Sequence, residues 1–475
     1  MPDRSVDVVV IGAGPGGYAA AFAAADKGMN VVIVDGDEQP GGVCLNRGCI
    51  PSKALLHIAK LINEAHEAEA WGVKFAKPKI DIDALRKWKN NVVGKNAGGV
   101  KQLAKMRNVE IIQAWARFEN STTLLLSSKP GGDADLGKLT YKHCILAVGS
   151  SPTVIPAFQV DSDRVMDSTA ALELPDVPKS MLVIGGGYIG LEMGSVYAAL
   201  GTEVSVVEMT DGLLPGADRD LVRILQKRLE SSFKEILLQT KVTGVKASAK
   251  EVGINFETAD GKARSEKYER VLIAVGRTPN SKNLGLENTK VKVIERGFVE
   301  INDKQQTADE HIYAIGDIAG EPMLAHKASR EAKVAVEVLA GEPGAFDVRA
   351  IPAVVFTDPE IAWAGLTETQ AKAKGIDVQV GKFPWGASGR ATAIGRNDGL
   401  TKILAAPGSQ TVLGVGIVGA GAGELIAEGV LAIEMGATVE DVALSIHPHP
   451  TLSETVMEGA ELTFGTTTHF APAKR

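Results

Sequence analysis

The sequence predicts an α/β protein made of two parallel-sheet domains and a third, C-terminal α+β domain. At 475 residues the chain is long enough for about three domains of ordinary size. Glycine is unusually frequent, at 52 residues, or about 11% against a usual frequency near 7%. The pattern strand, glycine-rich turn, helix, strand occurs twice, and it is typical of a βαβ unit with a parallel sheet.

The first copy begins with an apolar strand at 8–11 that leads into Gly12-x-Gly14-x-x-Gly17. In such a turn the first glycine permits a tight bend and the second lets the backbone approach a pyrophosphate. The third lets helix and strand pack closely, and the N-terminus of the following helix faces the phosphates. The next strand ends at Asp35, 23 residues after the first glycine, where a carboxylate can accept a hydrogen bond from a ribose hydroxyl. The segment predicts a dinucleotide site.

The second copy has a strand at 182–184, the turn Gly185-x-Gly187-x-x-Gly190, and Glu208 again 23 residues after the first glycine. An acid at this place accepts from a ribose 2′-hydroxyl and repels a 2′-phosphate, and no arginine follows it directly. The second copy therefore favours NAD over NADP. Two dinucleotide sites indicate two nucleotides, and FAD with a nicotinamide is the pair that we expect.

The similarity of the two copies extends beyond their glycine turns. Residues 141–149 and 268–276 are also alike, so the repeat is a duplication of domain size. Residues 129–138 have the composition of a hairpin loop, 291–317 are expected to return to strands, and 328–339 have helical composition.

The third domain is expected after a boundary at 341–350, where glycine, proline and polar residues gather. Beyond it, strands at 353–356 and 403–404 alternate with helices that begin near Thr367 and Glu424. This alternation predicts an α+β domain.

Charge and hydropathy exclude several classes of protein. The formal net charge of −7 provides no basic field for nucleic acid or an anionic membrane, and the basic cluster 86–89 is read as a solvated helix face. The apolar stretch 417–437 is interrupted by glutamates, so we expect a core helix there and no membrane span. Residues 1–7 resemble neither a signal peptide nor a transit peptide, and we expect a cytoplasmic protein.

Only three cysteines occur, and two of them, Cys44 and Cys49, lie five positions apart in the glycine-containing run 41–53. The third, Cys144, lies in an apolar strand and is expected to be a buried core thiol. A zinc site needs further Cys or His ligands at close spacing, so no metal site is predicted. A pair of reduced thiols is one interpretation. A redox-active disulfide, which a thiolate can open by exchange, explains the pair better.

Two histidines stand close together in the segment His447-Pro-His449-Pro-Thr-Leu-Ser-Glu454. One interpretation is that this segment is a stiff turn without a chemical role. Thiol chemistry, however, needs a base that titrates near neutral pH, and a carboxylate can fix the tautomer of an imidazole and raise its basicity. The sequence by itself does not choose between the two histidines.

Together these motifs resemble the flavoprotein disulfide reductase family over essentially the whole chain. The most specific element is the run 41–53, in which Leu45 and Ser52 match the branch that acts on lipoamide. Glutathione and trypanothione reductases usually have Val after the first cysteine and Lys in place of Ser52. Mercuric reductases add a C-terminal pair of cysteines, and no cysteine follows Cys144.

The resemblance implies an architecture and a function. It implies two Rossmann-like domains, one for FAD and one for NAD, and a C-terminal α+β dimerisation domain. Electrons are expected to pass from dihydrolipoamide through the Cys44–Cys49 disulfide and FAD to NAD⁺. The lipoyl group would come from a 2-oxo acid dehydrogenase or glycine cleavage complex. The expected segments are 1–152 for the first part of the FAD domain, 153–280 for the NAD domain, 281–348 for the part that completes the FAD domain, and 349–475 for the interface domain.

The resemblance also assigns roles to single residues. His449 and Glu454 correspond to the family's His-x-x-x-x-Glu dyad, which the partner subunit of a homodimer contributes to the active site. Lys53 and Glu192 match an ion pair beside the flavin ring. The remaining cofactor contacts are implied at Gly12, Gly14, Gly17, Asp35, Gly42, Lys53, Ala116, Gly149, Asp317, Met323 and Ala325 for FAD, and at Gly185, Gly187, Gly190, Glu208, Val242, Ala274, Gly276 and Arg277 for NAD.

Three positions depart from the family pattern. The family usually has Glu where Asp35 stands, so the ribose contact is expected to be longer or to pass through water. Val43 and Arg47 also replace commoner choices, and we hypothesise that Arg47, between the two cysteines, stabilises a thiolate. Two rival functions stay open: an NADPH-linked reductase of another disulfide, and a redox-sensing or flavin-binding scaffold without turnover.

Overall fold

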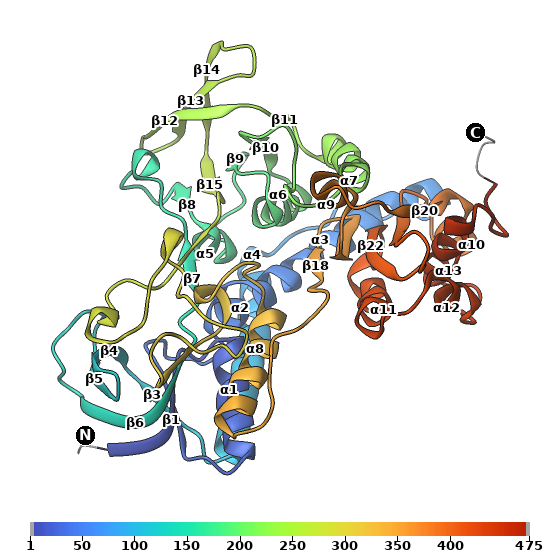
Figure 1. The fold of residues 1–475 in the computed structure, drawn as a ribbon. Helices are drawn as coiled ribbons and strands as arrows, with labels where there is room; N and C mark the ends of the chain where they lie inside the picture. The colour runs from blue at the N-terminus through green and yellow to red at the C-terminus, as the bar shows by residue number, and fades with distance from the viewer. Residues whose placement is uncertain (1–3, 472–475) are drawn as a thin grey trace.

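The computed structural model describes residues 4–471, so the first three residues of the N-terminal segment considered above lie outside the described residues. The chain forms two lobes built on parallel sheets and a C-terminal lobe beside them (Figure 1). Within residues 4–471, no helix combines the length and the apolar character that a membrane crossing requires.

The first lobe is built on a sheet whose parallel strands follow the order β3-β2-β1-β6-β17, with β5 and β4 added antiparallel. Side chains of β1 alternate between two clusters of buried residues, with Val9 in one cluster and Val8 and Val10 in the other. Because both faces of this strand are buried at residues 8–11, all of these residues are apolar, which explains the continuous apolar run in the sequence. The strands are β1 (Arg4–Ile11), β2 (Val31–Asp35), β3 (Glu110–Gln113), β4 (Trp115–Asn120), β5 (Thr123–Ser127), β6 (Gly137–Leu146) and β17 (Ile312–Ala314).

Helices α1 and α8 pack together against one face of this sheet. Helix α1 begins at Pro15, directly after the glycine turn, and its buried residues Ala20, Ala21 and Ala24 are small enough for close packing. The helices of this lobe are α1 (Pro15–Asp26), α2 (Gly42–Arg47), α3 (Cys49–Glu67), α4 (Ile82–Met106) and α8 (Ala325–Leu339), with short 3₁₀ turns η1 (Ala68–Trp71), η3 (Leu286–Asn288), η4 (Glu295–Gly297) and η5 (Gly316–Ile318).

The second lobe repeats the first, which confirms the duplication expected from the sequence. Its parallel sheet has the order β11-β10-β9-β15-β8, and a separate antiparallel sheet has the order β12-β13-β14. The short strands β7 and β16 pair where the chain enters and leaves this lobe. The elements are β7 (Ser150–Pro152), β8 (Val165–Met166), β9 (Ser180–Ile184), β10 (Glu203–Val207), β11 (Glu235–Leu237), β12 (Lys241–Ala247), β13 (Val252–Glu257), β14 (Ala263–Tyr268), β15 (Arg270–Ile273), β16 (Arg277–Pro279), η2 (Pro156–Phe158), α5 (Ser168–Leu172), α6 (Tyr188–Leu200) and α7 (Arg219–Ser232).

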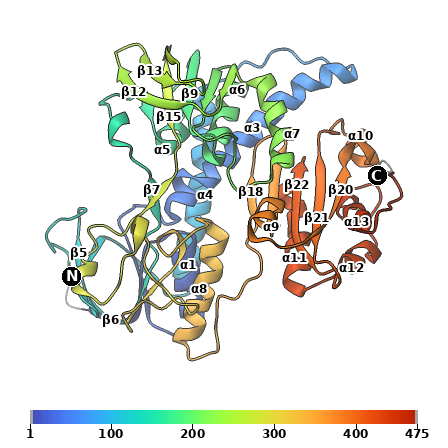
Figure 2. The same ribbon diagram turned by 45° about the horizontal axis from the view of Figure 1, so that its top comes forward.

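The C-terminal lobe is the predicted α+β domain. Its five antiparallel strands have the order β18-β19-β22-β21-β20, with α11 and α13 packed on the sheet, and α7 of the second lobe also contacts β19 and β22 (Figure 2). The elements are β18 (Ala353–Val355), β19 (Glu360–Gly365), β20 (Gln379–Pro384), β21 (Leu400–Ala405), β22 (Val412–Gly419), α9 (Glu368–Lys374), α10 (Gly389–Ala393), α11 (Ala422–Met435), α12 (Val439–Leu444), α13 (Glu454–Glu461), η6 (Trp385–Ala387) and η7 (Leu462–Phe464).

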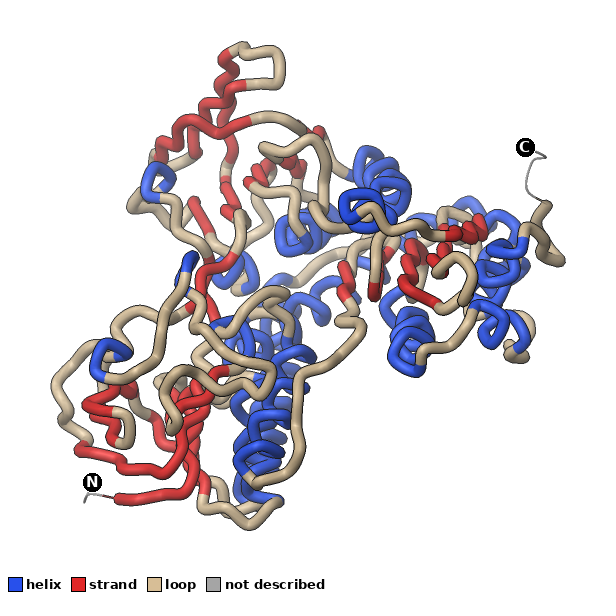
Figure 3. Tube along the Cα trace, in the orientation of Figure 1, coloured by secondary structure: helices blue, strands red, loops and turns tan. Residues whose placement is uncertain are grey.

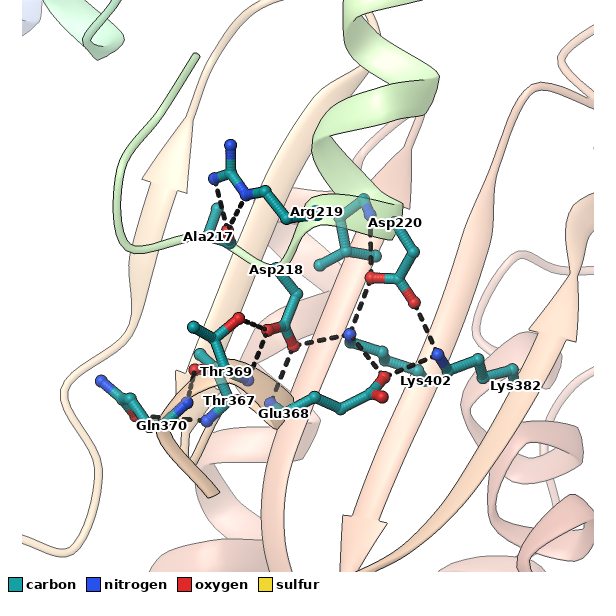
Figure 4. Close-up of polar contacts among 11 residues, drawn as sticks. Ala217, Asp218, Arg219, Asp220, Thr367, Glu368, Thr369, Gln370, Lys382 and Lys402 are labelled. Atoms are coloured by element: carbon teal, nitrogen blue, oxygen red, sulfur yellow. Dashed lines mark hydrogen bonds and ion pairs between the residues drawn. The ribbon is translucent and has the colours of Figure 1, made fainter. Parts of the chain in front are cut away.

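A buried lysine joins the second lobe to the C-terminal lobe (Figure 4). The Lys402 ammonium on β21 lies 2.8 Å from a carboxylate oxygen of Asp220 and 2.9 Å from one of Glu368, and it also pairs with Asp218. The Lys402 side chain is 1% exposed. The Asp218 carboxylate in addition accepts from the backbone N–H groups of Glu368 and Thr369, and so caps helix α9 of the other lobe.

Two expectations from the sequence are wrong. Residues 291–317 contain only one strand, β17; the rest is loop, isolated bridges, the 3₁₀ turn η4 and the start of η5 (Figure 3), because this segment runs over the surface before it joins the first sheet. The cluster 86–89 is not wholly a solvated face, since Lys89 is 2% exposed and donates to the carbonyl of Leu172. Leu85 precedes Lys89 by one helical turn, so both lie on the packed face of α4.

Candidate active site

The first glycine turn has the shape that a bound pyrophosphate requires. Gly12 has φ +102°, and a Cβ there would lie 2.3 Å from the carbonyl oxygen of Ala147. A Cβ at Gly17 would lie 1.8 Å from the carbonyl oxygen of Gly12, so this glycine is needed for helix–strand packing. A Cβ at Gly14 meets nothing nearer than 3.9 Å, which leaves room for a ligand at the N-terminus of α1.

The second turn repeats this geometry. A Cβ at Gly185, which has φ +109°, would lie 2.4 Å from the carbonyl oxygen of Ala274, and a Cβ at Gly190 would lie 2.3 Å from the carbonyl oxygen of Gly185. A Cβ at Gly187 meets no atom within 4 Å. The two turns therefore use their three glycines in the same three ways.

Asp35 and Glu208, which lie at the end of the second strand of each repeat, accept hydrogen bonds from the backbone of the neighbouring glycine turn. Asp35 accepts from the N–H groups of Ala13 and Asp37, and burial raises the pKa of its carboxyl group. Glu208 accepts from the N–H of Gly186 at 2.7 Å and from the N–H and hydroxyl of Thr210. Each carboxylate is thus fixed beside its turn, at the position where a ribose would lie.

A cavity of about 980 Å³ runs from the first glycine turn to the cysteine pair and then to the second lobe. Its wall includes residues from both lobes, and a dinucleotide fits a space of this size and polarity. All but one of the residues that the sequence assigned to FAD line it; the exception is Gly17, which is covered by Gly12. The lining residues among the sequence assignments are Gly12, Gly14, Asp35, Gly42, Cys44, Cys49, Lys53, Ala116, Gly149, Glu192, Arg277, Asp317, Met323 and Ala325.

Asp317 is held in this cavity by contacts that the sequence did not reveal. The hydroxyl of Ser150 donates to the Asp317 carboxylate at 2.5 Å, and the N–H of the preceding Gly316 donates to Glu331 of α8 at 2.7 Å. The Glu331 carboxylate in turn pairs with Lys327, and both side chains are at least 95% buried. The helical composition of 328–339 was the only sequence signal for this support.

Cys44 lies in the short helix α2 and Cys49 is the first residue of α3, with Gly48 between the two helices. The structure has Cys44 and Cys49 as free thiols, the first half-buried and the second exposed to the cavity. A hydrogen bond between the thiols lowers the pKa of Cys49 to about 7, and the charge of Lys53 assists while burial opposes. The same hydrogen bond, together with burial, raises the pKa of Cys44. Cys49 is therefore the sulfur that carries a thiolate near neutral pH.

The cation near these thiols is Lys53 rather than Arg47. Arg47 lies 2.7 Å from the carboxylate of Asp37 and is held there. The Lys53 ammonium lies 2.9 Å from Glu192, whose side chain is 4% exposed, and 4.4 Å from the centre of the Phe356 ring. The second oxygen of Glu192 accepts from the N–H of Phe356 at 3.0 Å, so the C-terminal lobe fixes this ion pair.

The two histidines of the C-terminal segment have different surroundings. The His449 Nδ1 lies 2.8 Å from Glu454, whose other oxygen accepts from the N–H of Thr451, and the His449 side chain is 71% exposed. Burial opposes these contacts, but together they lower the pKa of Glu454. His447 is held at both ring nitrogens, by Glu428 at 2.7 Å and by the carbonyl of Ser445, and its side chain is 6% exposed. Neither histidine lines the cavity of its own chain.

The remaining residues assigned to NAD have three different surroundings. Ala274 and Gly276 lie at the end of β15, where Ala274 closes the second glycine turn and Gly276 has φ +125°. Arg277 faces the first lobe instead and donates to the hydroxyl and the carbonyl of Ser150. The Val242 side chain is buried in the core of the antiparallel sheet, so only its backbone is available to a ligand.

Comparisons with known proteins agree with this geometry. Residues 6–332 match the family model described as pyridine nucleotide-disulphide oxidoreductase, and residues 351–460 match the dimerisation domain of the same family. The chain is 46% identical to a dihydrolipoyl dehydrogenase of Vibrio cholerae, over 98% of this chain and 97% of the relative, and 47% identical to one of Haemophilus influenzae over the same shares.

Solved structures give the same result for the fold. LpdA from Mycobacterium tuberculosis has a TM-score of 0.88 at 25% identity, with 96% of this chain and 99% of that chain covered. A Cu(II) complex of the HOCl-induced flavoprotein disulfide reductase RclA from Escherichia coli has a TM-score of 0.85 at 26% identity, with the same coverage.

Proposed function

The chain belongs to the pyridine nucleotide-disulphide oxidoreductase family, and on that premise we propose that it oxidises dihydrolipoamide with NAD⁺. The observation that carries the proposal is the position of Cys44 and Cys49 in the same cavity as the first glycine turn. A thiol pair there is adjacent to a dinucleotide, and FAD is the one the family uses. Bound at these residues, FAD supplies the two-electron transfer that links thiols to the nicotinamide.

The residues of this chain account for the thiol half of the reaction. His449 accepts the proton of a dihydrolipoamide thiol, and Glu454 holds the imidazole so that Nε2 faces outward. The resulting substrate thiolate attacks Cys44 of the oxidised pair, which forms a mixed disulfide and releases Cys49 as a thiolate. The positive charge of Lys53 stabilises that thiolate. The second substrate thiol then displaces Cys44, and lipoamide leaves with both cysteines reduced.

The choice of nicotinamide is assigned to Glu208. Its carboxylate is fixed beside the second glycine turn by three hydrogen bonds, so it cannot turn away from an added 2′-phosphate without losing them. The carboxylate and a 2′-phosphate are both negatively charged and would repel each other. NAD, which lacks that phosphate, is therefore the cofactor that we propose. The contacts of Gly185, Gly187, Gly190, Ala274 and Gly276 with NAD are part of the same proposal.

The assembly that we propose is a homodimer with a shared active site. The C-terminal lobe matches a dimerisation domain, and His449 does not line the cavity of its own chain. Apolar side chains on α11 and α12 and just beyond them are exposed, and a second copy of the chain would cover them. They are Leu431, Met435, Leu444 and Ile446, with Ile446 98% exposed.

Lipoyl domains of 2-oxo acid dehydrogenase or glycine cleavage complexes are the proposed partners, and the cytoplasm is the proposed location.

The division of the chain into segments is also a proposal. Segment 281–348 contributes β17 to the first sheet and α8 to its covering layer, which supports its assignment to the FAD domain after the NAD domain at 153–280. The segments 1–152 and 349–475 then form the rest of the FAD domain and the interface domain.

The proposed function is tested by following NADH formation from dihydrolipoamide, with NADP⁺ as the alternative acceptor. We expect turnover with NAD⁺ and little with NADP⁺. Cys44→Ser and Cys49→Ser should each abolish lipoamide turnover and leave the flavin bound, because neither cysteine is needed to close the glycine turn. Full activity in either variant would remove the disulfide from the mechanism. A yellow protein without turnover would favour the scaffold, and a preference for NADP⁺ would favour the rival reductase.

A further inference from the structure

Helix α13 carries a second pair of histidine and carboxylate next to the proposed dyad. Glu458 lies one helical turn after Glu454, and its side chain is 3% exposed. Its Oε1 contacts Nδ1 of His469, which belongs to the segment that follows η7. The His469 side chain is half exposed, so a buried carboxylate is joined to a solvent-facing imidazole.

The two pairs have the same arrangement. In each, one carboxylate oxygen contacts an imidazole Nδ1 and the other accepts from a backbone N–H, that of Thr451 for Glu454 and that of His469 for Glu458. The hydroxyl of Thr467 also donates to Glu458 at 2.7 Å. Both histidines therefore point Nε2 away from the helix.

Within the described residues 4–471, His469 is the ion-pair partner of the buried Glu458. Glu454, Glu458 and Glu461 all act on it, and the hydrogen bond and charge of Glu458 are the main reason that the pKa of His469 is raised. The two strands packed against α13 each carry a lysine that is paired elsewhere: Lys402 on β21 with Asp218, and Lys382 on β20 with Asp220 and Glu368. His469 in return lowers the pKa of Glu454.

We propose that His469 is a positioning residue, a cation that neutralises the buried Glu458 and so fixes the electrostatic environment in which Glu454 and His449 accept the substrate proton. Without it, the Glu458 carboxylate would add uncompensated negative charge one turn from Glu454. A nearby negative charge favours the protonated imidazole, and a protonated His449 cannot act as a base. The inference rests on the proposed function, because it concerns the base assigned there.

The test is the pH profile of reduction of the holoenzyme by dihydrolipoamide in a rapid-mixing experiment. For His469→Gln, the acidic midpoint of the pH profile should move up by about half a pH unit. The unpaired negative charge of Glu458 then acts on His449, and solvent screens part of that interaction. His469→Lys restores a cation and should bring the midpoint back toward that of the original protein. Thr467→Val removes a hydrogen bond to the same carboxylate but no charge, and it should leave the midpoint in place.

An unchanged midpoint in His469→Gln would overturn the inference, and so would an equal shift in Thr467→Val, which would indicate packing instead of charge. A second measurement separates this inference from the proposed function. The ring signals of His449 are titrated by NMR in histidine-labelled holoenzyme and assigned with His449→Gln. A shifted titration in His469→Gln supports the electrostatic role even where dihydrolipoamide is not oxidised, whereas an unshifted one contradicts it whatever the substrate.

Discussion

Cys44 and Cys49 differ in chemistry because one donates and the other accepts in the hydrogen bond that they share. The shared hydrogen bond lowers the pKa of Cys49 and raises that of Cys44, and Lys53 lies near both thiols. Lys53 is oriented by Glu192 and by the Phe356 ring, which belong to two other parts of the chain. Arg47 is closer to the cysteines in sequence, but its guanidinium is paired with Asp37.

We expect alkylation of the reduced holoenzyme by iodoacetamide to show this difference. Cys49 should be half-maximally modified near pH 7, the value about which its thiol titrates, because only the thiolate reacts. Lys53→Met should move this midpoint up by about one unit, since it removes an opposite charge near the thiolate. Mass spectrometry locates the modified residue at each pH.

Arg47→Leu is the control for that experiment, and it should leave the alkylation midpoint of Cys49 unchanged. A larger shift in Arg47→Leu than in Lys53→Met would show that the hypothesis drawn from the sequence was right and that the ion pair with Asp37 does not hold Arg47 away.

At the scale of single elements, strand β21 and helices α7 and α9 meet around one lysine (Figure 4). Three carboxylates, of Asp218, Asp220 and Glu368, lie close enough together to bind a cation, and the cation that they face is the Lys402 ammonium. Burial opposes ionisation of Asp218, but the contact with Lys402 and the backbone N–H groups of Thr369 and Glu368 together outweigh it and lower the pKa of that carboxyl group. A depressed carboxyl pKa contributes stability above the ordinary value near 4, and that contribution is lost as the pH falls through the folded-state value.

Lys402→Met should destabilise the contact between these lobes by about 3–5 kcal/mol, because it leaves the buried Asp218 carboxylate without its cation. Lys382 pairs with Asp220 and Glu368 as well, but its side chain is 40% exposed. Lys382→Met should therefore cost only about 0.2–1 kcal/mol. The midpoint of urea unfolding at pH 7 measures both, and equal shifts in the two variants would contradict the central role of Lys402. As the pH falls below about 4 the difference between the variants should shrink, because the carboxylates of Lys402→Met, which have lost their cation, then take up protons and no longer carry an unpaired charge.

At the scale of the whole molecule, the proposed base and the thiols lie in separate parts of one chain. The cavity contains the cysteine pair, while His449 is on the C-terminal lobe and exposed. A second copy of the chain would have to bring its own His449 to this cavity, and the apolar side chains on α11 and α12 and just beyond them are the surface that would hold it there.

Ile446→Asp should weaken this association, because it places a charge in the centre of a surface that becomes buried. We expect sedimentation velocity to show monomers and lipoamide oxidation to fall by at least tenfold. Flavin content and NADH-dependent reduction of ferricyanide should be retained, since both use one chain. Ile376→Asp changes an isoleucine that is 41% exposed in another part of the same lobe, and it serves as the matched control. A dimeric Ile446→Asp protein with full activity would contradict the shared site.

Local patterns in the sequence were sufficient for the two glycine turns, their acids and the position of the cysteine pair. Each of these depends on contacts within a few residues or within one βαβ unit, and such units have a fixed handedness and spacing. The same holds for α8, α9 and α11, whose helical composition is local, and for the capping residue Thr367 at the start of α9.

Only the tertiary structure decided which partners meet across the chain. It placed Phe356 against the Lys53–Glu192 pair, Asp317 with Ser150, and Lys89 against the end of α5, and it placed His447 in a buried contact with Glu428. These contacts join residues far apart in sequence, and neither periodicity nor spacing records which of many polar side chains will be buried together. The sequence by itself determined the nucleotide turns and the reactive pair of cysteines, whereas the charges around that pair were decided by packing between lobes.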